Sequence, residues 1–198
     1  MATCSYSASF LLLLSLGLLC DAQTPDMIRP TVGMISVING GEWGTWRSDD
    51  MCPIGTYAKG FMLKVEQYQS AGDDSALNGI TLICTSEDNQ AFFNIMSASG
   101  QWGCWTQPQW CPSGYLLAFR MRVETSQGAG DDTGANNVDF RCSDGSMLMG
   151  QGSSYGSYGS WSNDCGGKAI CGLRTKIEEW TTAGDDTALD DVQFYCCE

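Results

Sequence analysis

Apolar and polar residues alternate along several short stretches of the chain, and three of these stretches end in a cysteine. They are residues 80–84, 138–142 and 192–196. A period of two puts one apolar set on a common face of a β-strand. Further strands are expected at 32–38, 59–66, 92–97, 117–124 and 172–178. No window has a sustained helical period, so the sequence predicts an all-β protein.

The tetrapeptide Ala-Gly-Asp-Asp occurs three times, each time 13 residues before the cysteine that ends an alternating stretch. Its copies begin at Ala71, Ala129 and Ala183. Other positions recur in register: Glu66, Glu124 and Glu178 five residues upstream of these alanines, and Gly41-Glu42-Trp43, Gly100-Gln101-Trp102 and Gly159-Ser160-Trp161 further back. Periods of 58 and 54 residues indicate one supersecondary unit used three times.

A unit of this size with one apolar face cannot bury that face alone. Three units can do so if each forms a sheet and the three inner faces meet around an axis. An open linear solenoid is the alternative, but it needs distinct capping repeats, and none is evident in the sequence. We therefore expect a closed arrangement.

Residues 1–22 are typical of a secretory signal peptide. An apolar run from Phe10 to Leu19 is followed by Cys20-Asp21-Ala22, which fits a small-x-small cleavage site. The run is shorter than the roughly 18 residues that a membrane span needs. We predict a secreted, extracellular protein in which residues 23–198 form a single domain, with repeats at about 31–84, 91–142 and 147–197.

The chain has a net charge of −13 and contains no histidine. An acidic chain lacks the basic patch that binds nucleic acid or anionic membranes, so neither is expected as a partner. Basic secreted proteins fit the charge better. The absence of histidine excludes Ser-His-Asp and Cys-His catalysis and histidine-ligated zinc. We expect no metal site and no cofactor.

Removal of the leader leaves nine cysteines in 176 residues, which indicates a disulfide framework in a secreted protein. Three pairs recur in register with the repeats, and the two remaining cysteines of the third repeat are expected to pair with each other. The predicted bridges are Cys52–Cys84, Cys111–Cys142, Cys165–Cys196 and Cys171–Cys197. The spacing leaves open the exchanged pairs Cys171–Cys196 and Cys165–Cys197. Cys104, in the place of Thr45 in the first repeat, is predicted to be a free thiol.

Several motifs together carry a resemblance to a known family. They are Gly41-Glu42-Trp43-Gly44-Thr45-Trp46, Met51-Cys52-Pro53, Gly60-Phe61-Met62-Leu63-Lys64-Val65-Glu66, Gly72-Asp73-Asp74-Ser75-Ala76-Leu77-Asn78-Gly79-Ile80 and Cys196-Cys197. Over nearly the whole mature chain, the sequence resembles vitelline membrane outer layer protein 1 and its homologues. The resemblance implies a β-prism of three four-stranded Greek-key sheets around a pseudo-threefold axis. It also implies an extracellular protein of egg coats or other secretions.

The same resemblance implies a fold shared with jacalin-type lectins and an association with transferase-like activity on N-acetylglucosamine oligosaccharides. The family pattern needs only four bridges, without Cys104. A shared fold alone does not transfer function.

The Asp pairs are the most evident acidic motif: Asp73-Asp74, Asp131-Asp132 and Asp185-Asp186. Calcium binding is one interpretation, but the neighbours are Gly, Ala, Ser and Thr, and no distal Glu completes a ligand cage. We interpret the pairs as turns in which Asp side chains accept backbone N–H bonds before the last strand.

Glu66, Glu124 and Glu178 are the candidate catalytic residues. If they converge at one end of a threefold prism, they supply the paired carboxylates of glycoside chemistry. The alternative is structural, because each lies two residues after a basic residue on the same strand face. These basic residues are Lys64, Arg122 and Lys176.

Aromatic residues are the candidate carbohydrate-binding groups, because aromatic faces stack on the apolar faces of sugars. The tryptophans in register, such as Trp43 and Trp102, are interpreted as packing residues. The aromatic residues that break the threefold pattern are the better candidates: Trp110, Tyr155, Tyr158 and Trp180.

The leading hypothesis is a secreted structural or barrier protein of an extracellular coat that associates with coat or mucosal glycoproteins and glycans. The alternatives are a lectin-like carbohydrate-binding module and an N-acetylglucosamine-oligosaccharide transglycosylase. The residues favour the structural role over an enzyme, because the repeat accounts for most of the candidate groups.

Overall fold

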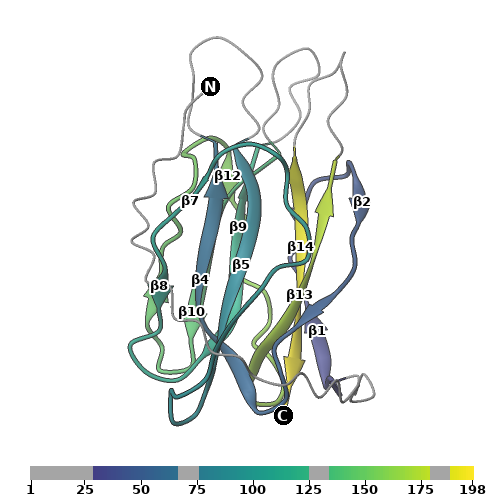
Figure 1. Ribbon diagram of the computed structural model, residues 1–198. Helices are drawn as coiled ribbons and strands as arrows, with labels where there is room; N and C mark the ends of the chain where they lie inside the picture. The colour runs from purple at the N-terminus through teal and green to yellow at the C-terminus, as the bar shows by residue number, and fades with distance from the viewer. Residues whose placement is uncertain (1–28, 67–75, 125–133, 179–187) are drawn as a thin grey trace, which may run out of the picture.

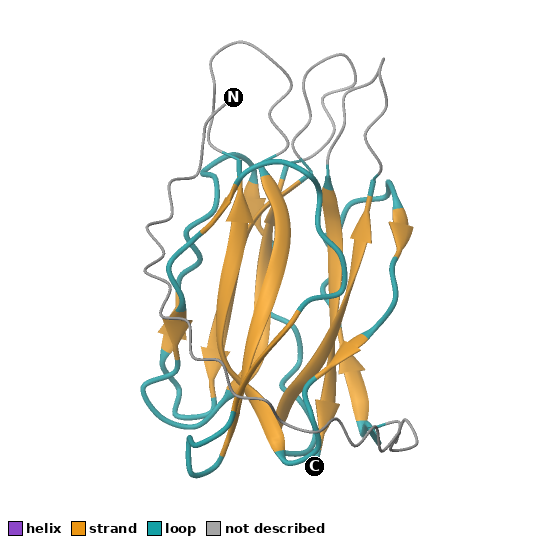
Figure 2. Cartoon of the chain, in the orientation of Figure 1, coloured by secondary structure: helices purple, strands orange, loops and turns teal. Residues whose placement is uncertain are grey.

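The computed structural model describes residues 29–66, 76–124, 134–178 and 188–198, and these residues form only strands, turns and loops (Figures 1 and 2). The predicted all-β class is confirmed. Within these four ranges no helix has the length and hydropathy needed to cross a bilayer. The leader, the three Asp pairs and Trp180 lie outside the described residues, so their interpretations stay predictions.

In the described part of the chain, fourteen strands form three antiparallel sheets, which we call A, B and C. Sheet A contains β1 (Gly33–Ile35), β2 (Thr45–Trp46), β3 (Asp50–Met51), β13 (Ala169–Ile177) and β14 (Leu189–Cys197). Sheet B contains β4 (Thr56–Val65), β5 (Leu77–Ser86), β6 (Phe92–Ile95), β7 (Cys104–Trp105) and β8 (Gln109–Trp110). Sheet C contains β9 (Leu116–Val123), β10 (Ala135–Cys142), β11 (Met147–Leu148) and β12 (Ser157–Tyr158).

Each sheet has the Greek-key order, in which the fourth strand returns to lie beside the first. In sheet B the order is β6-β5-β4-β7, and in sheet C it is β11-β10-β9-β12. Sheet A has the same order, β1-β14-β13-β2, but joins the two ends of the chain. The short strands β2, β7 and β12, one from each sequence repeat, therefore belong to the sheet formed by the preceding repeat, and the N-terminal segment closes the ring.

The core lies where the three inner faces meet. One or two phenylalanines from each sheet meet there: Phe61 from β4, Phe119 from β9, Phe140 from β10 and Phe194 from β14. The ring centroids of Phe61 and Phe140 are 4.6 Å apart, and those of Phe119 and Phe194 are 4.7 Å apart. Such tilted and edge-to-face contacts add to the burial of apolar area. The predicted period-two patterning thus builds one core shared by all three sheets.

The structure contains the four predicted bridges, Cys52–Cys84, Cys111–Cys142, Cys165–Cys196 and Cys171–Cys197, and not the exchanged pairs. The first three connect different sheets. Cys52 donates its N–H to Cys171 in sheet A and is bonded to Cys84 in sheet B. Cys111 likewise connects sheet B to sheet C, and Cys165 connects sheet C to sheet A. The repeated bridge therefore links the sheets in a ring, and Cys171–Cys197 joins β13 to β14.

The prediction of a free thiol at Cys104 is wrong, because Cys104 is itself disulfide-bonded. Its bond involves none of the eight cysteines above. The prediction rested on an odd count of cysteines, which leaves one without a partner. Cys104 lies on the half-buried edge strand β7, where a sulfur is accessible to a second cysteine.

Candidate functional site: an aromatic crown

Each sheet carries two aromatic residues separated by a glycine and one further residue. The three copies are Trp43-Gly44-Thr45-Trp46, Trp102-Gly103-Cys104-Trp105 and Tyr155-Gly156-Ser157-Tyr158. Strand register proves their equivalence, because Trp46 pairs with Lys176, Trp105 with Lys64 and Tyr158 with Arg122. Tyr155 and Tyr158 therefore belong to the threefold pattern, and the interpretation that they break it is wrong.

The strand register also shows that the alignment of Trp161 with Trp43 and Trp102 is wrong, because Tyr155 takes that place in the third copy. Trp161 follows β12 and lies beside Arg120, whose guanidinium carbon is 5.0 Å from its ring centroid. A signal for the correct register was present in the spacing: Tyr155 precedes Ala183 by 28 residues, as Trp43 precedes Ala71. Matching tryptophan to tryptophan concealed it, since the third sheet uses tyrosine.

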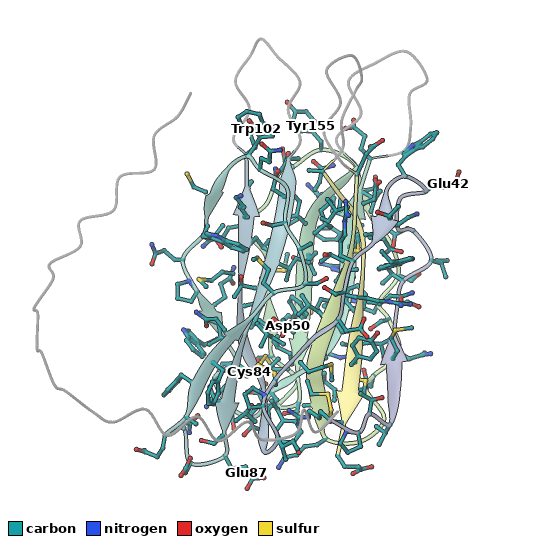
Figure 3. All side chains as sticks on the ribbon, turned by 45° about the vertical axis from the view of Figure 1, so that its right-hand side comes forward. Glu42, Asp50, Cys84, Glu87, Trp102 and Tyr155 are labelled. Carbon is teal, nitrogen blue, oxygen red and sulfur yellow. A yellow bond between two sulfur atoms is a disulfide. The ribbon has the colours of Figure 1, made fainter. Side chains whose placement is uncertain are left out.

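The first aromatic residue of each copy is exposed at one end of the prism. Trp43 is 59 % exposed, Trp102 43 % and Tyr155 43 %. Figure 3 shows Trp102 and Tyr155 at the same end as Glu42, which precedes Trp43. We call Trp43, Trp102 and Tyr155 the aromatic crown. Large exposed aromatic side chains in threefold register are available to a ligand rather than to the core.

The glycine after each crown residue fixes its position against a long strand. Gly103 has φ +83°, and a Cβ there would lie 2.4 Å from the backbone carbonyl of Val65 and 2.5 Å from the nitrogen of Glu66. A Cβ at Gly44 would likewise clash with the Ile177–Glu178 backbone, and a Cβ at Gly156 would clash with the Val123–Glu124 backbone. Each crown residue is therefore followed by a glycine that packs against the backbone at one of the three candidate glutamates.

The loops that carry the crown are held by a repeated set of hydrogen bonds. In sheet B, Gly100 donates its N–H to Asn78, and the Lys64 ammonium donates to the carbonyls of Gly100 (2.8 Å) and Gln101 (3.1 Å). In sheet A, Lys176 donates to the carbonyls of Gly41 and Glu42. In sheet C, Arg122 donates to the carbonyl of Ser154.

The three cations thus stabilise the crown loops through backbone carbonyls. Their pairing with the glutamates stays a prediction. Partial burial lowers the pKa of Lys64 below its ordinary value.

The three glutamates lie at the C-terminal ends of β4, β9 and β13, which point to the same end of the prism (Figure 1). Glu66 is 9 % exposed, and Glu124 and Glu178 are half-buried. Their backbone N–H groups donate to Ala76, Gly134 and Ala188 respectively.

These three acceptors have a left-handed backbone, and two of them are alanines, Ala76 with φ +50° and Ala188 with φ +44°. Strained backbone of this kind clusters at functional sites.

The second aromatic residue of each copy packs on the outer face of its sheet. The guanidinium carbon of Arg174 lies 4.9 Å from the ring centroid of Trp46. Tyr158 lies near Arg120 and Arg122, and its hydroxyl donates to Oδ1 of Asp139 at 2.8 Å. Burial, together with this bond to Asp139, raises the pKa of Tyr158 to about 12. These residues serve the fold.

Trp110 is part of a separate aromatic pair on sheet B. It lies opposite Gly60 on β4, four residues before Lys64, and its ring centroid is 6.2 Å from that of the exposed Phe92. The structure therefore does not bring Trp110 together with the crown. Among the described residues, no group of three or more His, Cys, Asp or Glu side chains is arranged to hold a metal ion.

Comparison with known proteins identifies the family. Residues 33–198 match the sequence profile described as vitelline membrane outer layer protein I. The chain belongs to this family. It is 48 % identical over 192 residues to the mouse protein named vitelline membrane outer layer protein 1 homolog, a match that covers 94 % of this chain and 95 % of the mouse one. The human homolog is 49 % identical over 190 residues and is covered to 93 %.

Solved structures confirm the β-prism. The Calystegia sepium agglutinin superposes with a TM-score of 0.54 at 12 % identity, over 85 % of this chain and 97 % of the agglutinin. A mannose-binding lectin from Champedak superposes with a TM-score of 0.51 at 16 % identity, over 86 % of this chain and 97 % of the lectin. At such identities the likeness concerns the fold alone.

Proposed function

We propose that this protein is secreted, forms part of an extracellular coat or barrier layer, and binds the glycans of that layer through the aromatic crown. The observation that carries the proposal is the crown itself: three exposed aromatic residues in equivalent positions, each followed by a glycine that packs against the backbone at a glutamate. Aromatic faces bind the apolar face of a sugar, and a neighbouring carboxylate accepts hydrogen bonds from its hydroxyl groups.

Three further observations support the proposal. The mouse and human relatives are named after the outer layer of the vitelline membrane, which is an extracellular coat. Solved proteins with this fold include an artocarpin–mannopentose complex and a lectin bound to a biantennary N-glycan. The ring of bridges between sheets suits an oxidising extracellular compartment, where disulfides persist.

Glycan-array binding and calorimetry with the triple variant Trp43→Ala, Trp102→Ala, Tyr155→Ala test the proposal. We expect the wild type to bind one glycan class, and the triple variant to bind it about 10- to 100-fold more weakly. Phe92→Ala with Phe93→Ala is the matched control, because these rings are equally exposed but lie on β6. Absence of binding by the wild type, or equal binding by the triple variant, would contradict the proposal.

A second candidate function is transfer between N-acetylglucosamine oligosaccharides. One observation favours it: Glu66, Glu124 and Glu178 follow equivalent strands at the same end of the prism, where the glycines after the crown residues pack against the backbone. The test is mass spectrometry of an N-acetylglucosamine hexamer incubated with wild type and with each Glu→Gln variant. If these residues catalyse the transfer, at least one variant loses about 100-fold or more in rate. Unchanged products in all three variants exclude this trio.

A further inference from the structure

The three seams between neighbouring sheets are not equivalent. At the A/B seam the N–H of Met96 donates to Asp50 (2.8 Å), and the hydroxyl of Ser97 donates to the carbonyl of Ser48 (2.6 Å). At the B/C seam Gln109 donates to the carbonyl of Met149 (2.6 Å), and the N–H of Ser113 donates to Asp144 (3.1 Å). Hydrogen bonds thus close both seams near their disulfides.

The C/A seam has a pocket at the corresponding place. Within the described part of the chain, no hydrogen bond joins residues 33–36 of sheet A to residues 163–166 of sheet C. A pocket of about 250 Å³ lies between them, next to the Cys165–Cys196 bridge. Its lining includes Gly33, Met34, Ser36, Asn163, Asp164 and Gly166.

A local change in the repeat accounts for the pocket. The first two copies place an apolar residue and a proline around the bridging cysteine, as Met51-Cys52-Pro53 and Trp110-Cys111-Pro112. The third copy has Asn163-Asp164-Cys165-Gly166, in which a residue is inserted and smaller side chains replace the large ones. The edge strand is also small here, since Gly33 lies opposite Cys196 where Phe93 lies opposite Cys84.

The groups around the pocket have the chemistry of a site for a neutral polyhydroxylated ligand. The side chains of Asn163 and Ser36 are exposed and supply an amide and a hydroxyl. Asp164 supplies a carboxylate, which Arg141 orients through an ion pair. β1 is an edge strand, so some of its backbone N–H and C=O groups face away from β14.

Other ligand classes fit the pocket less well. The carboxylate and the net charge of −13 disfavour an anion. A metal cation would find a single carboxylate in the pocket lining, that of Asp164, and this carboxylate is already paired with Arg141. The volume lies just below the range of pockets for drug-sized ligands, which begins at about 300 Å³, and so suits a ligand of one or two sugar rings.

We infer that the pocket at the C/A seam is a second saccharide subsite, which takes a terminal neutral sugar of a glycan chain. The inference rests on the proposed glycan-binding function and adds a site that is separate from the crown. Cys196, which lines the pocket, lies two residues before the C-terminal Glu198, at the end of the prism opposite the crown (Figure 1). A protein with a sugar site at each end can bridge two glycan chains, which is a property suited to a barrier layer.

The experiment is an NMR titration of the ¹⁵N-labelled protein with chitobiose and with mannobiose, followed at the amides of Gly33, Ser36, Asn163 and Gly166. We expect one of the two disaccharides to shift these amides saturably. Gly33→Leu should weaken this binding at least tenfold, because a Cβ at Gly33 meets no atom within 4 Å and the side chain can fill the pocket without disturbing the fold. Asn163→Ala should weaken it as well.

Asn94→Ala is the matched control, since Asn94 is an exposed asparagine on the edge strand of sheet B. The triple crown variant should keep the shifts at the seam. Shifts confined to the crown loops, or seam binding unaffected by Gly33→Leu, would overturn this inference and leave the proposed function intact. No saturable shift anywhere, together with a negative glycan array, would overturn both.

Discussion

The two aromatic residues of each repeated motif lie only three positions apart, yet they have opposite roles. Trp102 lies in the exposed crown, whereas Trp105 is half-buried and pairs with Lys64 in strand register, and its ring lies 3.4 Å from where a Cβ at Gly79 would be. The glycine between them has φ +83° and packs against the neighbouring strand. Residue type therefore does not distinguish a ligand-binding aromatic from a packing one, but backbone conformation does.

The largest effect is expected from the glycine that separates the two roles. Gly103→Ala places a methyl group 2.4 Å from the Val65 backbone, which cannot move without disrupting β4. We expect a loss of about 3 kcal/mol or more in the free energy of unfolding, measured by chemical denaturation. Gly55→Ala is the control, because Gly55 has the same φ of +83° but nothing within 4 Å of its Cβ position.

Gly55→Ala should cost only about 1 kcal/mol, from backbone strain alone. Equal losses for the two glycine variants would show that packing against Val65 does not fix the crown.

The next effect separates the two tryptophans of sheet B. Trp105→Ala removes a half-buried ring from the sheet surface, and we expect it to destabilise the protein by about 2 kcal/mol. Trp102→Ala, at a 43 % exposed position, should change stability by less than about 1 kcal/mol. Thermal unfolding of both variants, with glycan binding measured in parallel, checks the assignment. The comparison fails if Trp102→Ala is the more destabilising of the two.

The smallest effect concerns Asp191. This residue and its equivalents lie opposite the cation of the long strand, in the same cross-strand row as the second aromatic residue. Strand register places Asp191 beside Lys176 and Trp46, Asn137 beside Arg122 and Tyr158, and Gly79 beside Lys64 and Trp105. Burial raises the pKa of Asp191 to about 6. The folded protein therefore binds a proton that the unfolded chain releases above about pH 4, so this contribution to stability is lost as the pH rises to 6.

Asp191→Asn should stabilise the protein by about 1–2 kcal/mol at pH 7.4 and have little effect at pH 3.5. Asparagine is compatible with this position, since Asn137 accepts the N–H of Val138 as Asp191 accepts that of Val192. Unfolding temperatures of wild type and variant between pH 3.5 and 7.4 test the sign. A stabilisation independent of pH would show that burial of the charge is not its cause.

Much of the fold could be predicted from local patterns. Alternation identified the long strands. The spacing of the cysteines predicted Cys52–Cys84 and Cys111–Cys142, but it left two pairings open among the four cysteines of the third repeat, and the structure decided between them. The candidate site was harder to predict. The three glutamates were found because they are identical in all copies, but Tyr155 was assigned outside the pattern because tyrosine replaces tryptophan in the third sheet. Cys104 was predicted to be a free thiol, whereas the structure has it disulfide-bonded.

The sequence by itself determined that one β unit is used three times, which faces of its strands are apolar, and which cysteines share a register. These properties follow from periodicity and spacing along the chain. Only the tertiary structure decided that the short strand of each repeat joins the sheet of the preceding repeat and that the repeated bridge connects sheets. It also decided that two seams are closed while the third leaves a pocket. The pairing of strand edges and the closure of seams depend on contacts between residues far apart in the chain, which no local pattern specifies.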